Sequence, residues 1–433
     1  MDVFGKTPKF EPWWWEAVPR RWRAEPPALP SRADAIVVGG GYTGLSAALA
    51  LARAGRDVVV IEAETPGFGG SARNAGMIGS GHRVSFGNLE KRYGAGIAEE
   101  LMREGVRALS FSSGLIEQEG IDCDFRRVGR LRCAWRPQDY ETLARDAEIL
   151  RNKVGIEAEM VPRAEQHREI ASDRYHGGCL FPTHGGLHPA KFHQGLWALT
   201  ETAGARVVAP VRVSAIEGDS GEYTVTTAHG AVRARDVVVA TNAYTGPESP
   251  GLRRSLMPIA SYMFATEPLG ANRLRDLIPN DRMIVETRSR TCYYRPLPDD
   301  DRLLFGGRAA LRHVDPRKSG PILHQLMLSV LPQLGDVKIT HSWFGTLGFT
   351  MDHLPRVGRD RNGVHYAVGY SGSGVAMAPY LGWRAAQKIL GTSEASCAFD
   401  KLSVDPVPFR MGLPIALPFV EMWYRLKDWK EGT

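Results

Sequence analysis

Residues 34–64 read DAIVVGGGYTGLSAALALARAGRDVVVIEAE, and this stretch decides the fold. Its first apolar run, Ala35–Val38, enters the spacing Gly39-x-Gly41-x-x-Gly44, and the small residues that follow predict a helix over Tyr42–Arg53. A second apolar run, Val58–Ile61, comes next. A strand, a glycine turn, a helix and a second strand form a parallel βαβ unit of the kind that binds a dinucleotide.

Each glycine of the motif has its own physical role. Gly39 permits a tight turn, Gly41 lets the backbone approach a pyrophosphate, and Gly44 lets the helix pack closely on the strand. Tyr42 and Thr43 are the first two residues of the helix, whose N-terminus offers free N–H groups and a positive dipole end to the phosphates.

The second strand ends at Glu62, which is 18 residues beyond Gly44. A carboxylate at about this spacing accepts hydrogen bonds from ribose hydroxyls. An acid there would repel a 2′-phosphate, so the sequence predicts FAD or NAD as the ligand rather than NADP.

Composition narrows the class of protein. The chain has 433 residues, is 43% hydrophobic and carries a net charge of +6. Its basic residues are scattered, which gives little support to nucleic-acid binding and suits an anionic substrate or an anionic membrane surface. The cysteine count is odd, at five, and no pair has the CxxC spacing. We therefore expect no disulfide framework and no metal site, as in a reducing cytoplasm.

The rest of the chain supplies further parts of the same fold. Residues 67–82 are rich in glycine and small polar residues, and we expect their backbone to follow the pyrophosphate towards the reactive ring. The run Val237–Ala243 suits a buried parallel strand, and residues 364–390 again read strand, glycine turn and helix. Alternating patterns over 255–345 predict an antiparallel sheet.

These patterns predict a mixed α/β protein with a Rossmann-like FAD-binding domain and an inserted antiparallel-sheet substrate domain. Helical spacing predicts helices over 88–120, 137–153 and 191–203, and residues 125–136 read as a strand pair. The expected boundaries are an N-terminal arm at 1–33, nucleotide-domain pieces at 34–88, 188–250 and 345–395, a mostly helical part of the substrate domain at 89–187, a substrate-binding sheet at 251–344, and a tail at 396–433.

Both ends of the chain carry aromatic residues. We expect the arm, with Trp13–Trp15 and Trp22, to pack on the body of the protein. The apolar tail from Phe409 either packs on the body or lies on a membrane surface. The start lacks a signal pattern and no apolar run reaches about 18 residues, so we expect a cytoplasmic protein, with peripheral membrane contact as the alternative.

Five motifs together resemble the D-amino-acid-oxidase-like superfamily of flavoproteins, nearest its gamma-glutamylputrescine oxidoreductase branch. They are VVGGGYTG at 37–44, GGSARNAG at 69–76, VVATNA at 238–243, DHLPRVG at 352–358 and GYSGSG at 369–374. The resemblance spans about residues 28–395. The branch typically has Arg-Asn-Gly-Gly in the second motif, where this chain has Ala75 before Gly76.

The resemblance implies noncovalent FAD and oxidation of a C–N bond of an amine or amino acid. A hydride passes to the flavin, the resulting imine hydrolyses, and oxygen or a quinone accepts the electrons. The helix at Val375 would direct its N-terminus at the flavin and stabilise the reduced anion. The cofactor-binding residues expected are Gly39, Gly41, Tyr42, Thr43, Gly44, Glu62, Ser71, Arg73, Asn74, Ala75, Gly76, Met77, Val213, Ala240, Thr241, Asn242, Gly345, Asp352, Gly372, Gly374, Val375, Ala376 and Met377.

Substrate contacts are expected from the sheet. An arginine, Arg295 or Arg308, with Tyr293 would hold a carboxylate, because the guanidinium fork matches it bidentately. A local ion pair, with one of Asp299 to Asp301 or with Glu286, is the alternative for either arginine. His82 would touch substrate or flavin, carry a covalent flavin link, or be a plain loop histidine. His341 would line the same cavity. We assign no catalytic acid or base, since a neutral amine needs none.

Two other functions stay open. Some amine-oxidising relatives place an oxygen-activating lysine in the sheet, but the comparable strand here, Arg302–Gly306, has leucines. A membrane-associated dehydrogenase that passes electrons to a quinone or another carrier is therefore one alternative. A non-catalytic flavin-binding partner subunit is the other.

Overall fold

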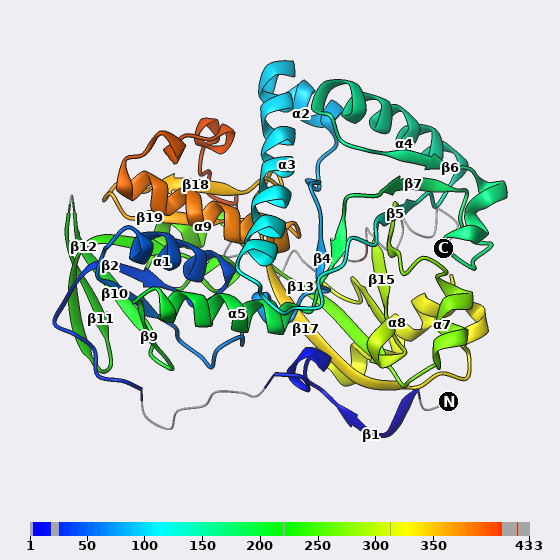
Figure 1. Ribbon diagram of the computed structural model, residues 1–433, viewed down its shortest axis with the longest axis horizontal. Coiled ribbons are helices and arrows are strands. Elements are labelled where there is room, and N and C mark those ends of the chain that lie inside the picture. Colours follow the sequence, from blue (N-terminus) through cyan, green and yellow to red (C-terminus); the bar gives the residue numbers. More distant parts are fainter. Residues whose placement is uncertain (1–2, 19–25, 220, 312, 409–421, 423–433) are drawn as a thin grey trace.

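Two large sheets organise the molecule, and they lie side by side along its longest axis (Figure 1). The computed structural model describes residues 3–18, 26–219, 221–311, 313–408 and 422. One sheet contains the parallel βαβ unit, and the other is mostly antiparallel. This arrangement agrees with the fold class predicted from the sequence.

The first sheet is built around the motif strand. β2 (Arg32–Val38) pairs in parallel with β3 (Val58–Ile61), and Ile36 lies opposite Val59. Both strands read as near-continuous apolar runs because helices and other strands cover both faces. In spatial order the main path is β10 (Val213–Asp219), β11 (Glu222–Thr227), β12 (Gly230–Val239), β2, β3 and β9 (Arg206–Val208), while β19 (His365–Val368) pairs with β12 and with β18 (Arg356–Arg359).

Three helices gather on this sheet (Figure 1). α1 (Tyr42–Arg53) packs against both α5 (Pro189–Thr202) and α9 (Gly374–Leu390). A Cβ at Gly382 would lie 2.1 Å from the carbonyl oxygen of Thr43. The close approach of α9 to α1 therefore requires a glycine at this crossing.

The second sheet spans the substrate part of the molecule. Within the described residues it has nine strands, in the spatial order β1 (Phe4–Lys9), β17 (Ile339–Phe349), β13 (Met257–Thr266), β16 (Arg302–Gly307), β15 (Cys292–Leu297), β14 (Met283–Glu286), β5 (Arg130–Cys133), β7 (Gly178–Phe181) and β6 (Glu159–Val161). β13 and β17 are antiparallel over their full length. A short ladder joins β4 (Met77–Ile78) to β8 (Gly185–Gly186).

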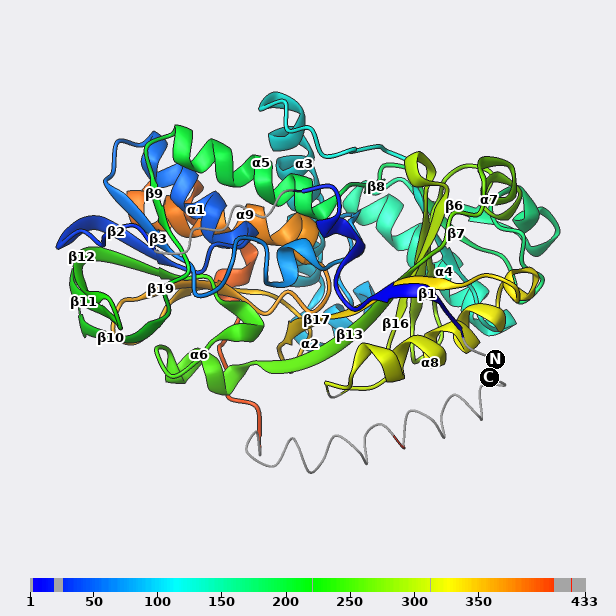
Figure 2. The same ribbon diagram turned by 90° about the horizontal axis from the view of Figure 1, so that it is seen from below.

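The remaining helices are divided between the two sheets. α8 (Pro316–Leu328) packs on β13 and β17, as Figure 2 shows from below. α3 (Ala95–Gln118) packs on α9 and on α2 (Phe86–Tyr93), and α4 (Pro137–Ile149) packs on β6 and β7. α6 (Pro250–Ser255) contributes Leu252 to the core of the first sheet, and α7 (Ala271–Leu277) contributes Leu274 and Leu277 to the core of the second.

Two predicted elements differ from the structure. The single helix expected over 88–120 is divided into α2 and α3, because Gly94 adopts φ +84° and its N–H closes the last turn of α2. The strand pair expected over 125–136 is one strand, β5, with partners β7 and β14. Both partners are remote in sequence, so local alternation alone could not supply the pairing.

The N-terminal arm joins the fold, as expected. β1 adds a parallel edge strand to β17, and the side chain of Trp14 is buried. Trp22 and most of the tail, 409–421 and 423–433, lie outside the described residues, so the prediction of a membrane-facing tail is not tested. Across the described residues, no helix combines the length and the apolar character needed to cross a membrane.

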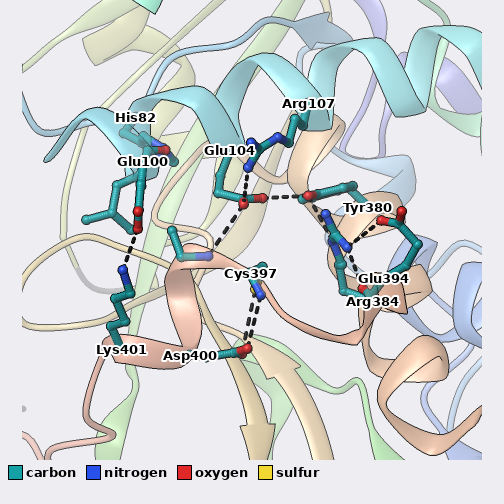
Figure 3. Close-up of polar contacts among 12 residues, drawn as sticks. His82, Glu100, Glu104, Arg107, Tyr380, Arg384, Glu394, Cys397, Asp400 and Lys401 are labelled. Carbon is teal, nitrogen blue, oxygen red and sulfur yellow. Dashed lines mark hydrogen bonds and ion pairs between the residues drawn. The ribbon is translucent and has the colours of Figure 1, made fainter. Parts of the chain in front are cut away.

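Polar contacts hold the segment after α9 against α3 (Figure 3). The carboxylate of Glu104 accepts hydrogen bonds from Tyr380 at 2.5 Å and from Arg107 at 2.7 Å. Arg384 pairs with Glu394 at 2.9 Å. Lys401 Nζ pairs with Glu100 of α3 at 2.5 Å, so both α9 and the segment that follows it contact α3 (Figure 3).

Candidate active site

Two adjoining cavities run from the glycine motif to the second sheet. The smaller has a volume of about 220 Å³ and is bordered by the glycine turn and Glu62. The larger has a volume of about 500 Å³ and lies over the second sheet. Their common border is uncharged and consists of Gly70, Asn74, Thr346, Leu347, Ser371, Gly372 and Val375. The two cavities can therefore hold one continuous ligand.

Glu62 fixes the glycine turn from the tip of β3. Its carboxylate accepts the N–H of Gly40 at 2.7 Å and the N–H of Glu64 at 2.9 Å. Burial raises the pKa of Glu62, although these backbone hydrogen bonds oppose the rise. The carboxylate borders the cavity and retains acceptor capacity for a ligand hydroxyl.

The glycines of the motif have the geometry their roles require. Gly39 adopts φ +105°, which an L side chain rarely tolerates. A Cβ at Gly44 would lie 1.9 Å from the carbonyl oxygen of Gly39, so the helix could not approach the turn. The N–H of Tyr42 donates to Ser71 Oγ at 3.0 Å, which joins the start of α1 to the second motif.

That second motif forms a loop held from several sides. Trp14 Nε1 donates to the carbonyl of Asn74 at 2.8 Å, and Trp343 Nε1 donates to the carbonyl of Arg73 at 2.9 Å. Asn74 Nδ2 donates to the carbonyl of Ser71 at 2.9 Å. Because tryptophans from the arm and from β17 hold it, the loop is pre-organised at the common border.

Most residues expected to bind the cofactor border these cavities. The smaller cavity is lined by Gly39, Gly41, Tyr42, Thr43, Glu62, Ser71, Asn74, Val213, Ala240, Thr241, Asn242, Gly372, Gly374 and Val375. Arg73, Ala75, Met77 and Gly345 line the larger cavity. Gly44, Gly76, Asp352, Ala376 and Met377 line neither of the two.

Asp352 and Met377 have other roles than the sequence suggested. The Asp352 carboxylate accepts hydrogen bonds from Tyr93 at 2.6 Å and from Arg356 at 2.7 Å. The N–H of Met377 donates to the carbonyl of Ser373 inside α9 at 3.2 Å and so is not directed at a ligand. Asp352 therefore joins Tyr93 of α2 to Arg356 of β18, whereas the Met377 N–H belongs to the first turn of α9.

Arg295 does not face the substrate cavity, contrary to the expectation. Its guanidinium is buried, and Nη1 donates to the carbonyl oxygens of Gly76 at 3.0 Å and Leu187 at 2.9 Å. A Cβ at Gly186 would lie 2.8 Å from Arg295 Cζ, so the guanidinium packs directly against the backbone of Gly186. The strand prediction was right, but the backbone of Gly76 and Leu187 covers this part of the sheet face and binds the side chain.

His341 also lies away from both cavities. Its ring packs edge-on against Trp13, and Nε2 lies 3.0 Å from Glu16 Oε1. Both partners belong to the N-terminal arm, whose docking site could not be located from the sequence.

His82 does border the larger cavity. Its Nε2 donates to the carbonyl of Leu101 at 2.7 Å, which leaves Nδ1 as a buried atom without a hydrogen-bond partner in the described structure. Burial lowers the pKa of His82, so the ring is neutral. Its ring also packs edge-on against Phe399.

Tyr293 and Arg308 line the larger cavity as expected. The Tyr293 hydroxyl lies 2.8 Å from Ser261 Oγ, and burial raises the pKa of Tyr293 to about 12. A Cβ at Gly306 would lie 2.3 Å from the Tyr293 ring, so the ring lies flat across β16. Tyr293 therefore presents a neutral phenol to the cavity.

Several charged residues of the larger cavity were not found from the sequence. Arg130 and Arg132 of β5 line it, together with Asp146 and His184. The alternation of β5, in which Leu131 and Cys133 are buried on the opposite face, was the available signal. Within the described residues no group of three histidine, cysteine or acidic side chains could hold a metal ion.

These linked cavities fit a flavin dinucleotide. An acid lies at one end, a glycine turn at a helix N-terminus follows it, and an uncharged border leads into the second cavity. The acid suits a ribose, the glycine turn at the helix N-terminus suits a pyrophosphate, and the uncharged border suits an aromatic ring.

Comparison with known proteins identifies the family. A family model described as FAD dependent oxidoreductase (DAO) matches residues 34–388. The chain is 35% identical to the gamma-glutamylputrescine oxidoreductase of Escherichia coli K12, over 91% of this chain and 92% of the relative. It is 32% identical to the probable oxidoreductase OrdL of Rhizobium meliloti, over 96% and 97%.

Solved structures show the same fold. Glycine oxidase from Geobacillus kaustophilus superposes with a TM-score of 0.73 at 23% identity, covering 88% of this chain and 99% of that one. L-proline dehydrogenase from P. horikoshii gives a TM-score of 0.70 at 21% identity, covering 89% and 99%. The family model and the sequence relatives, together with the linked cavities, show that the chain belongs to the DAO family of FAD-dependent oxidoreductases.

Proposed function

We propose that the protein oxidises the C–N bond of an amine in the larger cavity, giving an imine that hydrolyses. The main support for this proposal is that an uncharged border joins this cavity to the nucleotide cavity. FAD, held noncovalently, supplies the acceptor for the hydride from the carbon next to nitrogen. The relatives named above and the glycine oxidase fold support an amine or amino acid as substrate.

The charges of the cavity favour a neutral amine at the reacting end. Among the described residues, six arginines and two carboxylates line the larger cavity. An excess of positive charge disfavours the ammonium form, and hydride transfer requires the free nitrogen lone pair. Arg308 and the neutral phenol of Tyr293 then orient the substrate beside the common border. No side chain has to remove a proton from a substrate that binds in this form.

A dehydrogenase is the second candidate, because no lysine is among the described residues that line the larger cavity. A lysine beside the flavin activates oxygen in some amine-oxidising relatives. In this reading the electrons leave to a quinone or another carrier, and reaction with oxygen is slow.

Anaerobic reduction of the purified holoenzyme tests the proposal. The flavin absorbance near 450 nm (a general property of oxidised flavins) should bleach with a terminal primary amine. D- and L-amino acids and alcohols of equal length complete the panel. Bleaching by amines alone supports the proposal, and bleaching by none of the panel would overturn it.

Admission of air to the reduced enzyme then separates the two acceptors. Rapid recovery of the colour with peroxide identifies an oxidase, whereas slow recovery with fast turnover on an artificial quinone identifies the dehydrogenase. A flavin that no amine reduces, in a stable complex with another chain, would indicate the partner-subunit alternative.

A further inference from the structure

The N-terminal arm joins the two halves of the molecule beside the flavin loop, residues 69–76. On one side, β1 pairs with β17 of the second sheet, where the N–H of Ile339 donates to the carbonyl of Val3 at 2.9 Å. On the other side, the turn Trp13–Trp15 contacts α5, which packs on α1. Figure 2 shows the arm running from β1 to the start of α5. The arm therefore contacts elements of both halves.

Trp14 makes the central contact of the arm. Its side chain is buried, and its ring packs edge-on against His188, the residue before α5, with centroids 4.8 Å apart. Its Nε1 donates to the carbonyl of Asn74 at 2.8 Å. The Asn74 side chain in turn accepts the N–H of Gly76 at 2.8 Å and donates to the carbonyl of Ser71 at 2.9 Å. The arm thus binds the flavin loop at the residue that fixes its turn.

A shared core joins the arm to the loop a second time. Trp14, Trp343 of β17 and Ala72 of the loop are buried in one apolar cluster, and Trp15 packs against it. The guanidinium carbon of Arg73 lies 4.7 Å from the centroid of the Trp15 ring, which is a cation–π contact. Undocking the arm would expose this core, so the arm and the loop are ordered together.

The arm acts on the cofactor site only through the loop. No arm residue is among the described residues that line either cavity, whereas Gly70 and Asn74 border both. The N–H of Tyr42 donates to Ser71 Oγ at 3.0 Å, so the same loop also meets the start of α1. The family model begins at residue 34, after the arm. Any effect of the arm on FAD therefore passes through residues 69–76.

We propose that docking of the arm and binding of FAD are coupled through Trp14, which acts as a positioning residue for the flavin loop. A loop with three glycines has many conformations of its own, and FAD binds the one that the Trp14 hydrogen bond holds. Trp14 raises the fraction of molecules with this conformation, and the apparent Kd falls in proportion. Because linkage is reciprocal, FAD stabilises the docked arm by a similar factor. The inference holds whichever amine the protein oxidises.

Trp14→Phe is the first test, because it keeps an aromatic ring and removes the indole N–H. The Kd for FAD, measured by fluorescence titration of the apoprotein, should rise about tenfold. At saturating FAD the visible circular dichroism of the bound flavin should match the wild type, because the bound loop has the same geometry. An unchanged Kd in a folded Trp14→Phe variant would overturn the inference.

Trp13→Phe is the matched control from the same turn. Its indole is hydrogen-bonded to the Asp300 side chain, and its ring contacts His341 and Arg302 rather than the flavin loop. The variant loses the same kind of hydrogen bond and should bind FAD as the wild type does. An equal rise of Kd in both variants would show a general loss of stability and would remove the role of Trp14. Thermal unfolding of each apoprotein shows whether the variants are folded.

Hydrogen exchange of the wild type tests the reciprocal effect without a substitution in the arm. The N–H groups of Trp15 and Glu16 donate to the carbonyls of Pro12 and Trp13, at 3.1 Å and 3.0 Å, and lie outside both cavities. FAD should slow their exchange about tenfold, and Trp14→Phe should lose this protection.

Exchange in the arm that FAD leaves unchanged in the wild type would overturn the coupling, even if Trp14→Phe did not fold. Titration and exchange both use FAD alone, without an amine. Their outcome is therefore independent of whether an amine reduces the flavin, and either proposal can fail while the other stands.

Discussion

Arg295 Nη1 donates a hydrogen bond of 3.0 Å to the carbonyl oxygen of Gly76, at the end of the flavin loop. The sheet thereby holds the loop through a buried cation, and burial lowers the pKa of Arg295 to about 10. The sequence placed Arg295 among the substrate contacts. Its hydrogen bonds instead make it a residue that positions the loop.

Arg295→Gln should therefore weaken FAD retention and stability. The loss of charged hydrogen bonds to two buried carbonyls should cost about 3 kcal/mol of folding free energy. Urea unfolding and the FAD content after gel filtration measure both effects. Arg308→Gln is the comparison: it lies on the same sheet and lines the cavity, so it should change KM for the amine and keep its FAD. A normal FAD content in Arg295→Gln would contradict the assignment.

Gly44→Ala should abolish FAD binding or folding of the nucleotide domain. Its Cβ would meet the carbonyl oxygen of Gly39 at 1.9 Å, and neither backbone can give way without opening the turn. Gly96→Ala in α3 is the control, since nothing lies within 4 Å of its Cβ. That change should stabilise the protein by about 0.5–1 kcal/mol, because a helix favours alanine over glycine. Soluble yield, flavin content and melting temperature distinguish the two variants.

Glu62→Gln should weaken FAD binding and leave the chemistry of bound flavin unchanged. A neutral amide is a poorer acceptor than a carboxylate for the Gly40 N–H and for ribose hydroxyls, and the difference amounts to about tenfold in Kd. Fluorescence titration of the apoprotein with FAD measures the change. Glu201→Gln, on the exposed face of α5, should bind FAD as the wild type does. An unchanged Kd in Glu62→Gln would remove this residue from the cofactor site.

Asp352→Asn should destabilise the protein in a pH-dependent way. Burial alone would raise the pKa of Asp352, but the hydrogen bonds from Arg356 and Tyr93 and the charge of Arg356 together hold this pKa below the usual range of an aspartate. A carboxylate with a lowered pKa in the folded state contributes stability above its unfolded pKa. That contribution is lost as the pH falls through the folded pKa.

The deficit of Asp352→Asn should be about 3 kcal/mol at pH 7 and should shrink below about pH 4, where the wild type loses the same contribution. Urea midpoints of the holoenzyme between pH 7 and 3 measure it. Asp299→Asn is the control, because this carboxylate pairs with Arg126 on the surface. Its effect should stay within about 0.5 kcal/mol at every pH. A deficit that does not change with pH would contradict the charge assignment.

The sequence alone determined the nucleotide half of the site. Gly39, Gly44 and Glu62 are set by local rules, because a tight turn, a close helix–strand contact and a strand-end acid all act within one βαβ unit. The same holds for strands β2 and β3, because a near-continuous apolar run predicts a strand that is buried on both faces. Fourteen of the residues expected to bind the cofactor line the smaller cavity.

Only the tertiary structure decided the substrate half. Arg295 and Tyr293 lie on the same face of β15. The Arg295 guanidinium is bound by the backbone near Gly76 and Gly186, whereas the Tyr293 ring lines the larger cavity. Arg130 joins them from a strand whose partners, β7 and β14, are remote in sequence. The alternation of side chains along a strand predicts which residues share a face of the sheet. The order of the strands, which is set by long-range packing, decides which loops and cavities that face contacts.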